Sequence, residues 1–378
     1  MNHPIRVMQV VGRMMGGGVE ATVMNYYRHI NRKRVQFDFV VQSDSLMVPK
    51  EEIESLGGRI FSVPSYSNPI AYMNACSRIF EATHPLIVHS HMNAISFFTL
   101  GAAKYAGVPI RIAHSHSTSN PKELKKTAVK NILRPFSRIY PTNLAACSNY
   151  AARWLFGDKA VNEKQVHIIK NAIDLQVFRY DSDVRRFLRE IIGARESTLV
   201  VGQVGRLCFQ KNQQLTLRAF SELLSMEPNS LLVFIGTGDN EKQLRDLADE
   251  LHVSESVHFL GMRNDVASWY SAFDVLAFPS EYEGLGMAAV EAQAEYLPVV
   301  ASDKVTNEAL IEKQLCYLVP LKASSEIWAR TILKAARTNL ISRDCSDIVQ
   351  TLQIAGYDIT QSVNGLQKWY ENLAKESN

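Results

Sequence analysis

The sequence lacks the features that mark membrane-spanning, secreted and disulfide-rich proteins. No apolar run reaches the roughly 20 residues that a helix needs to cross a bilayer, and the first apolar stretch, 5–11, ends at Gly12-Arg13, too early for a signal peptide. The 5 cysteines are scattered and form no C-x-x-C pair, which excludes a disulfide framework and a zinc ribbon. The composition, 46% hydrophobic and 21% charged, excludes a disordered chain. We therefore expect a cytoplasmic protein of about two domains, since one domain takes roughly 150 residues.

Charge is unevenly distributed between the two halves of the chain. Residues 1–180 carry 22 Lys and Arg against 11 Asp and Glu (+11), whereas residues 181–378 carry 19 against 27 (−8), which gives the net charge of +3. A basic half indicates an anionic partner such as a phosphate or a membrane surface. The densest basic stretch, 122–138, has the pattern of a basic amphipathic helix. It suits either peripheral contact with the inner face of the membrane or a solvated face whose Lys and Arg stems cover apolar surface.

Short Val- and Ile-rich runs alternate with helix-length segments along the whole chain, which predicts βαβ units and doubly wound parallel sheets. Eleven such runs are too many for one open sheet, so we expect two Rossmann-like domains. The charge change and the polar stretch at 179–183 put the boundary near residue 180. This gives an N-terminal domain 1–180 and a C-terminal domain 181–356, with a last helix, 357–378, that packs back on the first. The runs are 5–11, 37–41, 86–89, 110–114 and 144–147 for one sheet, and 166–169, 199–204, 231–235, 257–260, 275–278 and 299–301 for the rest.

Ligands of doubly wound sheets bind beyond the carboxyl ends of the strands, so the loops that follow the strands are the candidate site. Gly16-Gly17-Gly18 follows the first run and precedes a helical pattern, as in loops whose amides approach an anion. It does not match the dinucleotide fingerprint G-x-G-x-x-G. Arg206 and Lys211 follow the run 199–204, and two cations in one loop can neutralise a diphosphate.

The most informative segment is 278–292, in which a buried strand ends, a polar loop with two glycines follows and a helix starts near Gly286. Glu283 lies in the loop and Glu291 in the helix. Eight residues at about 1.5 Å each place them at most about 12 Å apart. One carboxylate could bind sugar hydroxyls and the other a ribose diol, with the amides of 284–287 at the positive end of the helix between them.

The pattern Glu283-x7-Glu291 with E-G-L-G inside it resembles the signature of the retaining GT-B glycosyltransferases of family 4. The glycine loop at 16–20, G-R-L…K at 205–211 and N-A-I-D…F at 171–178 are similar to further motifs of this family. The resemblance covers most of the chain and is greatest to bacterial exopolysaccharide and capsule enzymes. It implies the GT-B fold, in which two Rossmann-like domains face each other across a cleft.

The resemblance also implies roles for individual residues. Arg206 and Lys211 would bind the donor diphosphate and stabilise its developing charge, Glu283 the donor sugar and Glu291 the ribose. Further donor-binding positions are expected in the loops: Gly17, Gly18, Met262, Arg263, Gly284, Leu285, Gly286 and Met287. No metal ion and no cofactor are expected, because the cations and the helix end would replace a metal.

Two His-Ser-His pairs, 89–91 and 114–116, each end a predicted strand. Four histidines could bind a metal, but no carboxylate or cysteine completes an obvious ligand set. The family resemblance instead implies one histidine near the donor sugar. The motif offset leaves His116, our choice, and His114 as alternatives.

Three positions depart from the family pattern, because Ala172, Asn212 and Tyr296 replace glycines that the family commonly has. They shape turns and do not change the charges of the site. The expected activity is transfer of a sugar, with retention, from a nucleotide sugar such as a UDP-sugar to a saccharide or polyprenyl-linked acceptor in cell-surface polysaccharide synthesis. The alternatives are a UDP-sugar 2-epimerase and a non-catalytic nucleotide-sugar-binding partner. No nucleic-acid-binding module is found.

Overall fold

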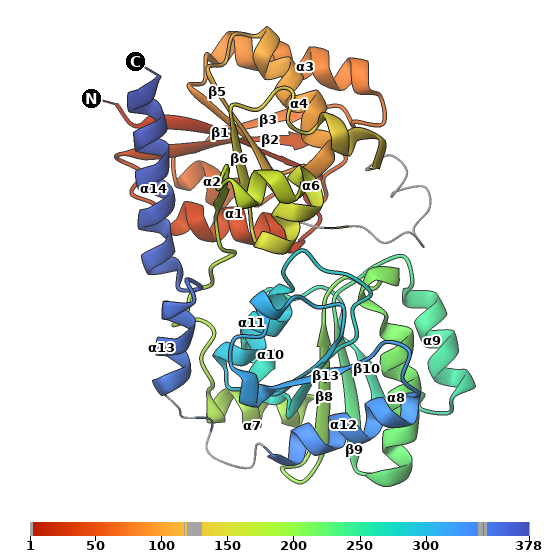
Figure 1. Cartoon of the computed structure of the whole chain (residues 1–378). Helices are drawn as coiled ribbons and strands as arrows, with labels where there is room; N and C mark the ends of the chain where they lie inside the picture. The colour runs from red at the N-terminus through yellow and green to blue at the C-terminus, as the bar shows by residue number, and fades with distance from the viewer. Residues whose placement is uncertain (1–2, 117, 119–130, 339–342, 344–345, 378) are drawn as a thin grey trace. The chain divides into compact units, whose positions relative to one another are not determined.

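The chain folds into two compact units, each built on a parallel β-sheet with helices packed against it (Figure 1). The computed structural model describes residues 3–116, 118, 131–338, 343 and 346–377. Unit 1 comprises Met1–Ala172 and Gly356–Asn378, and unit 2 comprises Ile173–Ala355. The first unit thus gives way to the second after Ala172, whereas the sequence suggested a boundary near residue 180.

Unit 1 holds a seven-stranded sheet in the order β3-β2-β1-β4-β5-β6-β7, with every neighbouring pair parallel. Its strands are β1 (Ile5–Gly12), β2 (Val35–Gln42), β3 (Ile60–Val63), β4 (Ile87–Ser90), β5 (Ile110–Ser115), β6 (Asn143–Ala146) and β7 (Val166–Ile168). Its described helices are α1 (Gly18–His29), α2 (Lys50–Ser55), α3 (Pro69–Thr83), α4 (Ser96–Tyr105), α6 (Asn149–Asn162) and α14 (Ile359–Glu376).

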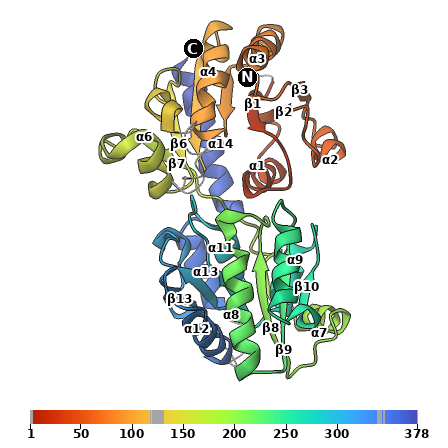
Figure 2. The ribbon, with the colours of Figure 1, turned by 90° about the vertical axis from the view of Figure 1, so that its right-hand side faces the viewer.

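Unit 2 holds a six-stranded parallel sheet in the order β10-β9-β8-β11-β12-β13. Its strands are β8 (Leu199–Val204), β9 (Ser230–Ile235), β10 (Val257–Phe259), β11 (Val275–Phe278), β12 (Val299–Ser302) and β13 (Cys316–Val319). Its helices are α7 (Ser182–Ile191), α8 (Gln213–Met226), α9 (Glu241–Glu250), α10 (Val266–Ala272), α11 (Met287–Ala294), α12 (Ser325–Thr338) and α13 (Ser346–Ile354). In Figure 2, α8 lies in front of the sheet.

The two faces of the unit 1 sheet bury different apolar clusters, because alternate residues of a strand point to opposite faces. In β1, Val7 and Val11 belong to the cluster with α1 and α14, whereas Met8 and Val10 belong to the cluster with α3, α4 and α6. Gln9 is two residues from both Val7 and Val11 and so lies on the same face of β1, the face toward α14. The last helix thus lies on this face of the sheet, where it contacts α1, β1 and β2.

The structure differs from the sequence-based expectations at the edges of the sheets. β3 and β13 were not predicted. Each is a four-residue edge strand whose first three residues are partly exposed, so the apolar signal is weak. The run at 166–169 was grouped with the later strands, but β7 pairs with β6 in the first sheet. In the polar stretch 179–183, Asp181 is the N-cap of α7, and its side chain accepts from the amides of Asp183 and Val184.

Two features relate to membrane contact. Among the described residues, no helix is both long and apolar enough to span a bilayer. Of the basic stretch 122–138, residues 122–130 lie outside the described part of the chain.

Candidate functional site

In unit 2 the predicted donor-binding loops lie at the point where the strand order reverses. β8 and β11 are neighbours, yet the chain runs outward from β8 through β9 to β10 and then returns to β11. The loop after β8 carries Arg206 and Lys211, and the loop after β11 carries Glu283. Doubly wound sheets bind ligands at such a switch point.

Lys211 and Glu283 form a close ion pair that joins these two loops. Nζ of Lys211 lies 2.6 Å from Oε1 of Glu283, and the side chains are only 17% and 8% exposed. The amide of Gln210 donates to Oε2 of the same carboxylate at 3.3 Å, and the Lys211 ammonium lies 5.0 Å from the centre of the Phe278 ring. The structure therefore brings together a cation and an acid that are far apart in the sequence. Gln210 was not singled out from the sequence, although it stands next to Lys211.

Arg206 is exposed, and its side chain makes no hydrogen bond or ion pair with any residue that the structure describes. Its backbone is fixed instead, because the Gln213 amide donates to the Arg206 carbonyl at 2.9 Å. Leu207 N, next in the chain, donates to the carbonyl of Thr237 at 3.0 Å. The guanidinium can thus reach an anion from a rigid loop.

Glu291 lies on α11, the helix that follows the loop of Glu283. Its Oε2 accepts a hydrogen bond of 2.7 Å from the hydroxyl of Tyr270. Burial raises the pKa of Glu291, while the Tyr270 hydroxyl and the charge of Lys211 act in the opposite direction. Tyr270, which lies on α10, was not expected from the sequence, because no motif there signals a contact with α11.

The predicted turn at Gly284-Leu285-Gly286-Met287 ends where the sequence placed the helix start. Gly286 is the N-cap of α11 with φ +104°, a left-handed conformation that favours glycine. A Cβ at this position would lie 3.1 Å from the Phe278 ring. The turn therefore needs glycine, and the first amides of α11, beginning with Met287, lie at the positive end of the helix.

Two of the three positions that replace a family glycine keep a glycine-like backbone. Asn212 has φ +52° and Tyr296 has φ +55°. Left-handed backbone is uncommon for residues other than glycine, and asparagine tolerates it better than most. The backbone is thus left-handed directly after Lys211 and shortly after the end of α11, although neither residue is glycine.

Met262 and Arg263 follow β10 at the outer side of the sheet. Met262 is exposed, and Arg263 forms an ion pair with Asp265 at 2.6 Å and lies 5.4 Å from the Trp269 ring. Because the Arg263 guanidinium is already engaged, this loop offers its backbone to a ligand more readily than its charge.

In unit 1 the glycine loop is closed by an acid of its own helix. Gly17 is the N-cap of α1, and the Glu20 carboxylate accepts hydrogen bonds from the amides of Gly17 and, at 2.9 Å, Met15. Nothing lies within 4 Å of a Cβ built at Gly18. An anion that binds the Gly17 amide would have to replace the Glu20 carboxylate.

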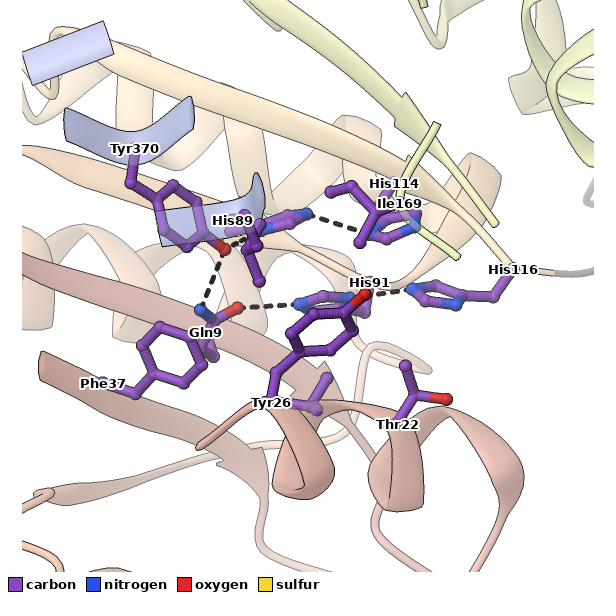
Figure 3. Close-up of a pocket in the computed structure, with 12 residues that line it drawn as sticks. Gln9, Thr22, Tyr26, Phe37, His89, His91, His114, His116, Ile169 and Tyr370 are labelled. Carbon is purple, nitrogen blue, oxygen red and sulfur yellow. Dashed lines mark hydrogen bonds between the residues drawn. The ribbon is translucent and has the colours of Figure 1, made fainter. Parts of the chain in front are cut away.

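The four histidines of the two His-Ser-His pairs come together inside unit 1 (Figure 3). The pairs lie on neighbouring parallel strands, and the two-residue spacing puts both members of a pair on the same face. All four side chains are buried, and burial lowers the pKa of each, for His116 to about 3. The set surrounds a cavity of about 20 Å³.

Among the described residues, one group has the spacing to hold a metal ion. It consists of His89, His91 and His114, whose ligand atoms lie within 4.8 Å of one another. We call His89, His91, His114 and His116 together the histidine cluster. His116, our predicted sugar contact, and the alternative His114 both belong to it and are both buried, so burial does not distinguish them.

These two parallel sheets, the second with its β8 and β11 loops joined by a buried cation–carboxylate pair, define a doubly wound α/β protein of two Rossmann-like units. Two family models match the chain: "Glycosyltransferase Family 4" over residues 16–177 and "Glycosyl transferases group 1" over residues 184–348. The chain is 34% identical over 379 residues to "Putative glycosyltransferase EpsF" of Bacillus subtilis (strain 168), covering 98% of this chain and 97% of that one. It therefore belongs to the family 4 glycosyltransferases of GT-B fold.

Other similar proteins agree with this assignment. The "Capsular polysaccharide biosynthesis glycosyltransferase CapH" of Staphylococcus aureus is 25% identical over 376 residues, covering 97% of this chain and 98% of that one. The solved structure of Anabaena Alr3699/HepE in complex with UDP-glucose has a TM-score of 0.80 at 17% identity, covering 97% of this chain and 99% of that one. WaaG, a glycosyltransferase involved in lipopolysaccharide biosynthesis, has a TM-score of 0.69 at 16% identity, covering 99% of this chain and 98% of that one. These two likenesses concern the fold.

Proposed function

We propose that this glycosyltransferase moves a sugar from a nucleotide sugar, most simply a UDP-sugar, to a saccharide or lipid-linked saccharide in cell-surface polysaccharide synthesis. The observation that carries the proposal is the Lys211–Glu283 pair at the switch point of unit 2, with the exposed Arg206 in the same loop. The names of the relatives support the donor and the pathway. One of them, 24% identical over 296 residues, is an Escherichia coli enzyme whose name gives UDP-Gal as donor and a diphosphoundecaprenol-linked acceptor.

The proposed chemistry depends on where charge develops. As the bond between the anomeric carbon and the diphosphate breaks, negative charge grows on the phosphate oxygens. Arg206, Lys211 and the N-terminus of α11 would stabilise that charge from positions fixed in advance, which requires little reorganisation. These groups would take the place of a metal ion.

The two acids would hold the two ends of the donor. Glu283 would accept hydrogen bonds from sugar hydroxyls and Glu291 from the ribose diol, both with charge assistance. The raised pKa of Glu291 indicates that this side chain would gain from diol donors. The backbone at Met262 and Arg263 would contact the base.

Further parts of the proposal rest on the family resemblance. Transfer would proceed with retention of the anomeric configuration. His116 would stabilise the positive charge that develops on the sugar through its backbone carbonyl, or bind a sugar hydroxyl, and Gly17 and Gly18 would bind near the phosphate. Peripheral membrane contact through 122–138 remains part of the proposal, and co-sedimentation with anionic and with neutral vesicles would test it.

The ion pair suggests a sharp experiment, because Lys211 would exchange Glu283 for the diphosphate when the donor binds. Lys211→Ala should weaken UDP binding. Glu283→Gln should bind UDP at least as tightly as the wild type, since the ammonium then loses a competing anion, yet it should lose sugar transfer. Lys334→Ala, which removes an exposed cation of α12, is the matched control.

Binding is measured by calorimetry with UDP and by thermal shift with a panel of nucleotide sugars, and turnover by release of free nucleotide diphosphate. Equal UDP affinity in Lys211→Ala and Lys334→Ala would contradict the proposed site. Consumption of a UDP-sugar without acceptor and without UDP release would favour an epimerase. Binding without any turnover would favour a non-catalytic partner.

A further inference from the structure

The histidine cluster of unit 1 contains two hydrogen-bonded chains that meet at one residue pair (Figure 3). In the first chain, Tyr370 of α14 contacts His89, which contacts His114. In the second chain, Gln9 of β1 contacts His91, which contacts His116. Gln9 and Tyr370 also contact each other, so they join the two chains.

Each neutral imidazole in such a chain donates with one nitrogen and accepts with the other. The direction of the first bond therefore sets the tautomer of every ring that follows. The rings are neutral, because burial lowers the pKa of all four histidines. Among the described residues that line the cavity there is no Asp or Glu, and the titratable groups besides the histidines are Tyr26 and Tyr370. The charge of His167, on β7, acts to lower the pKa of His89 and His114 further.

Two distances fix the direction of the first chain. The Tyr370 oxygen lies 2.6 Å from Nδ1 of His89, which suits an O–H donor and is shorter than usual for an N–H donor. Nε2 of Gln9 donates to the Tyr370 oxygen at 3.3 Å, because an amide NH2 group cannot accept. With the amide reversed, the same distance would be long for an O–H···O bond. Tyr370 therefore donates to His89 and accepts from the Gln9 amide.

The rest follows by counting protons. In the first chain, His89 accepts at Nδ1, so its Nε2–H donates to Nδ1 of His114 at 3.0 Å. Because Gln9 donates its N–H to Tyr370, its oxygen faces His91 and accepts from Nε2–H at 2.8 Å. Nδ1 of His91 then accepts from Nε2–H of His116 at 2.8 Å. All four rings are thus Nε2–H tautomers, and reversal of the Gln9 amide would make all four Nδ1–H.

The two chains end on atoms that have no partner among the residues described, Nε2 of His114 and Nδ1 of His116. A buried polar atom without a partner loses its hydrogen bonds to water and gains none in return, so it calls for an explanation. Near a sugar that gains positive charge, a neutral ring with a bare Nδ1 lone pair is favourable and an imidazolium is not.

We propose that Gln9 and Tyr370 are positioning residues that hold His116 as the neutral Nε2–H tautomer, with Nδ1 unprotonated. The functional meaning of this tautomer rests on the proposed role of His116 at the donor sugar. The tautomer itself is a property of unit 1 and is testable without any donor.

The test is two-bond ¹H–¹⁵N correlation of the imidazoles in the full-length protein labelled at histidine, with signals assigned by single His→Gln variants. At pH 7.5 the four cluster histidines should all show the Nε2–H pattern. Gln9→Met should give His91 and His116 a population of the Nδ1–H form and leave His89 and His114 unchanged, because Tyr370 still donates to His89. A merely structural role for Gln9 would not produce this selective change.

Tyr370→Phe removes a single oxygen and provides the second variant if Gln9→Met does not fold. It should give His89 and His114 an Nδ1–H population, because their donor is lost, and His91 and His116 as well, because the Gln9 amide loses the acceptor that sets its direction. An Nδ1–H ring or an imidazolium in the wild-type cluster would overturn the proposal. So would four unchanged rings in both variants, or stoichiometric zinc bound by the wild type, because a metal on His89, His91 and His114 would use the lone pairs of the chains. UDP titration of the same samples separates this result from failure of the donor site.

Discussion

The buried histidines should make the stability of unit 1 fall steeply at mildly acidic pH. In the folded chain their pKa values lie below the ordinary 6.5 because burial disfavours the imidazolium. The unfolded chain takes up a proton at each of these histidines near pH 6.5, while the folded chain does not. The free energy of unfolding is therefore highest above pH 6.5 and decreases as the pH falls toward the folded pKa values.

The magnitude follows from the same linkage. At pH 5.5 each histidine that is protonated only in the unfolded chain lowers the free energy of unfolding by about 1.4 kcal/mol. Four such residues give about 5.6 kcal/mol, which is comparable with the whole stability of many domains. Each His→Gln substitution in the histidine cluster should therefore reduce the fall between pH 7.5 and 5.5 by about a quarter.

The assay is urea unfolding at pH 7.5, 6.5 and 5.5, followed by fluorescence. Trp369, which stacks on His167 at 4.3 Å between ring centres, reports on unit 1. The change with pH is measured within each variant, so a general loss of stability in His91→Gln does not affect the comparison. His252→Asn, which removes an exposed histidine at a left-handed position, is the control. A wild type equally stable at pH 7.5 and 5.5, or the same fall in His91→Gln, would refute the reasoning.

Three further predictions concern other parts of the chain. Arg206→Ala or Lys211→Ala should lose roughly two to three orders of magnitude in turnover, since one electrostatic donor contributes about 2.7–4 kcal/mol to the barrier; near wild-type rates with saturating donor would contradict their roles. Burial raises the pKa of Glu295 to about 8 against the opposing Ser271 hydroxyl. The folded chain therefore keeps this proton up to about pH 8, so the free energy of unfolding should decrease by about 2 kcal/mol as the pH rises from 6 to 8.5. Glu295→Gln should remove this decrease in urea unfolding at the two pH values. Truncation after Gly356 removes α14, which buries apolar side chains against the unit 1 sheet; limited proteolysis should then digest unit 1 faster than unit 2, and an unchanged pattern would contradict this packing.

The sequence by itself determined the local features of this protein. The apolar runs predicted eleven of the strands, because parallel strands that are buried on both faces need continuous Val- and Ile-rich segments. The glycine turn before α11 and the cap of α7 were also predictable, since both depend on neighbours in the chain. The edge strands β3 and β13 escaped because their half-exposed residues carry little apolar signal.

Tertiary structure decided which distant residues meet. Lys211 and Glu283 stand 72 positions apart, and they form an ion pair because the chain returns to place β11 beside β8. Gln9 and Tyr370, 361 positions apart, connect the histidine chains because α14 folds back onto the face of β1 that carries Gln9. Sequence periodicity shows which face a side chain occupies but not which strand or helix lies opposite. Only the strand order and the packing of the last helix supply those partners.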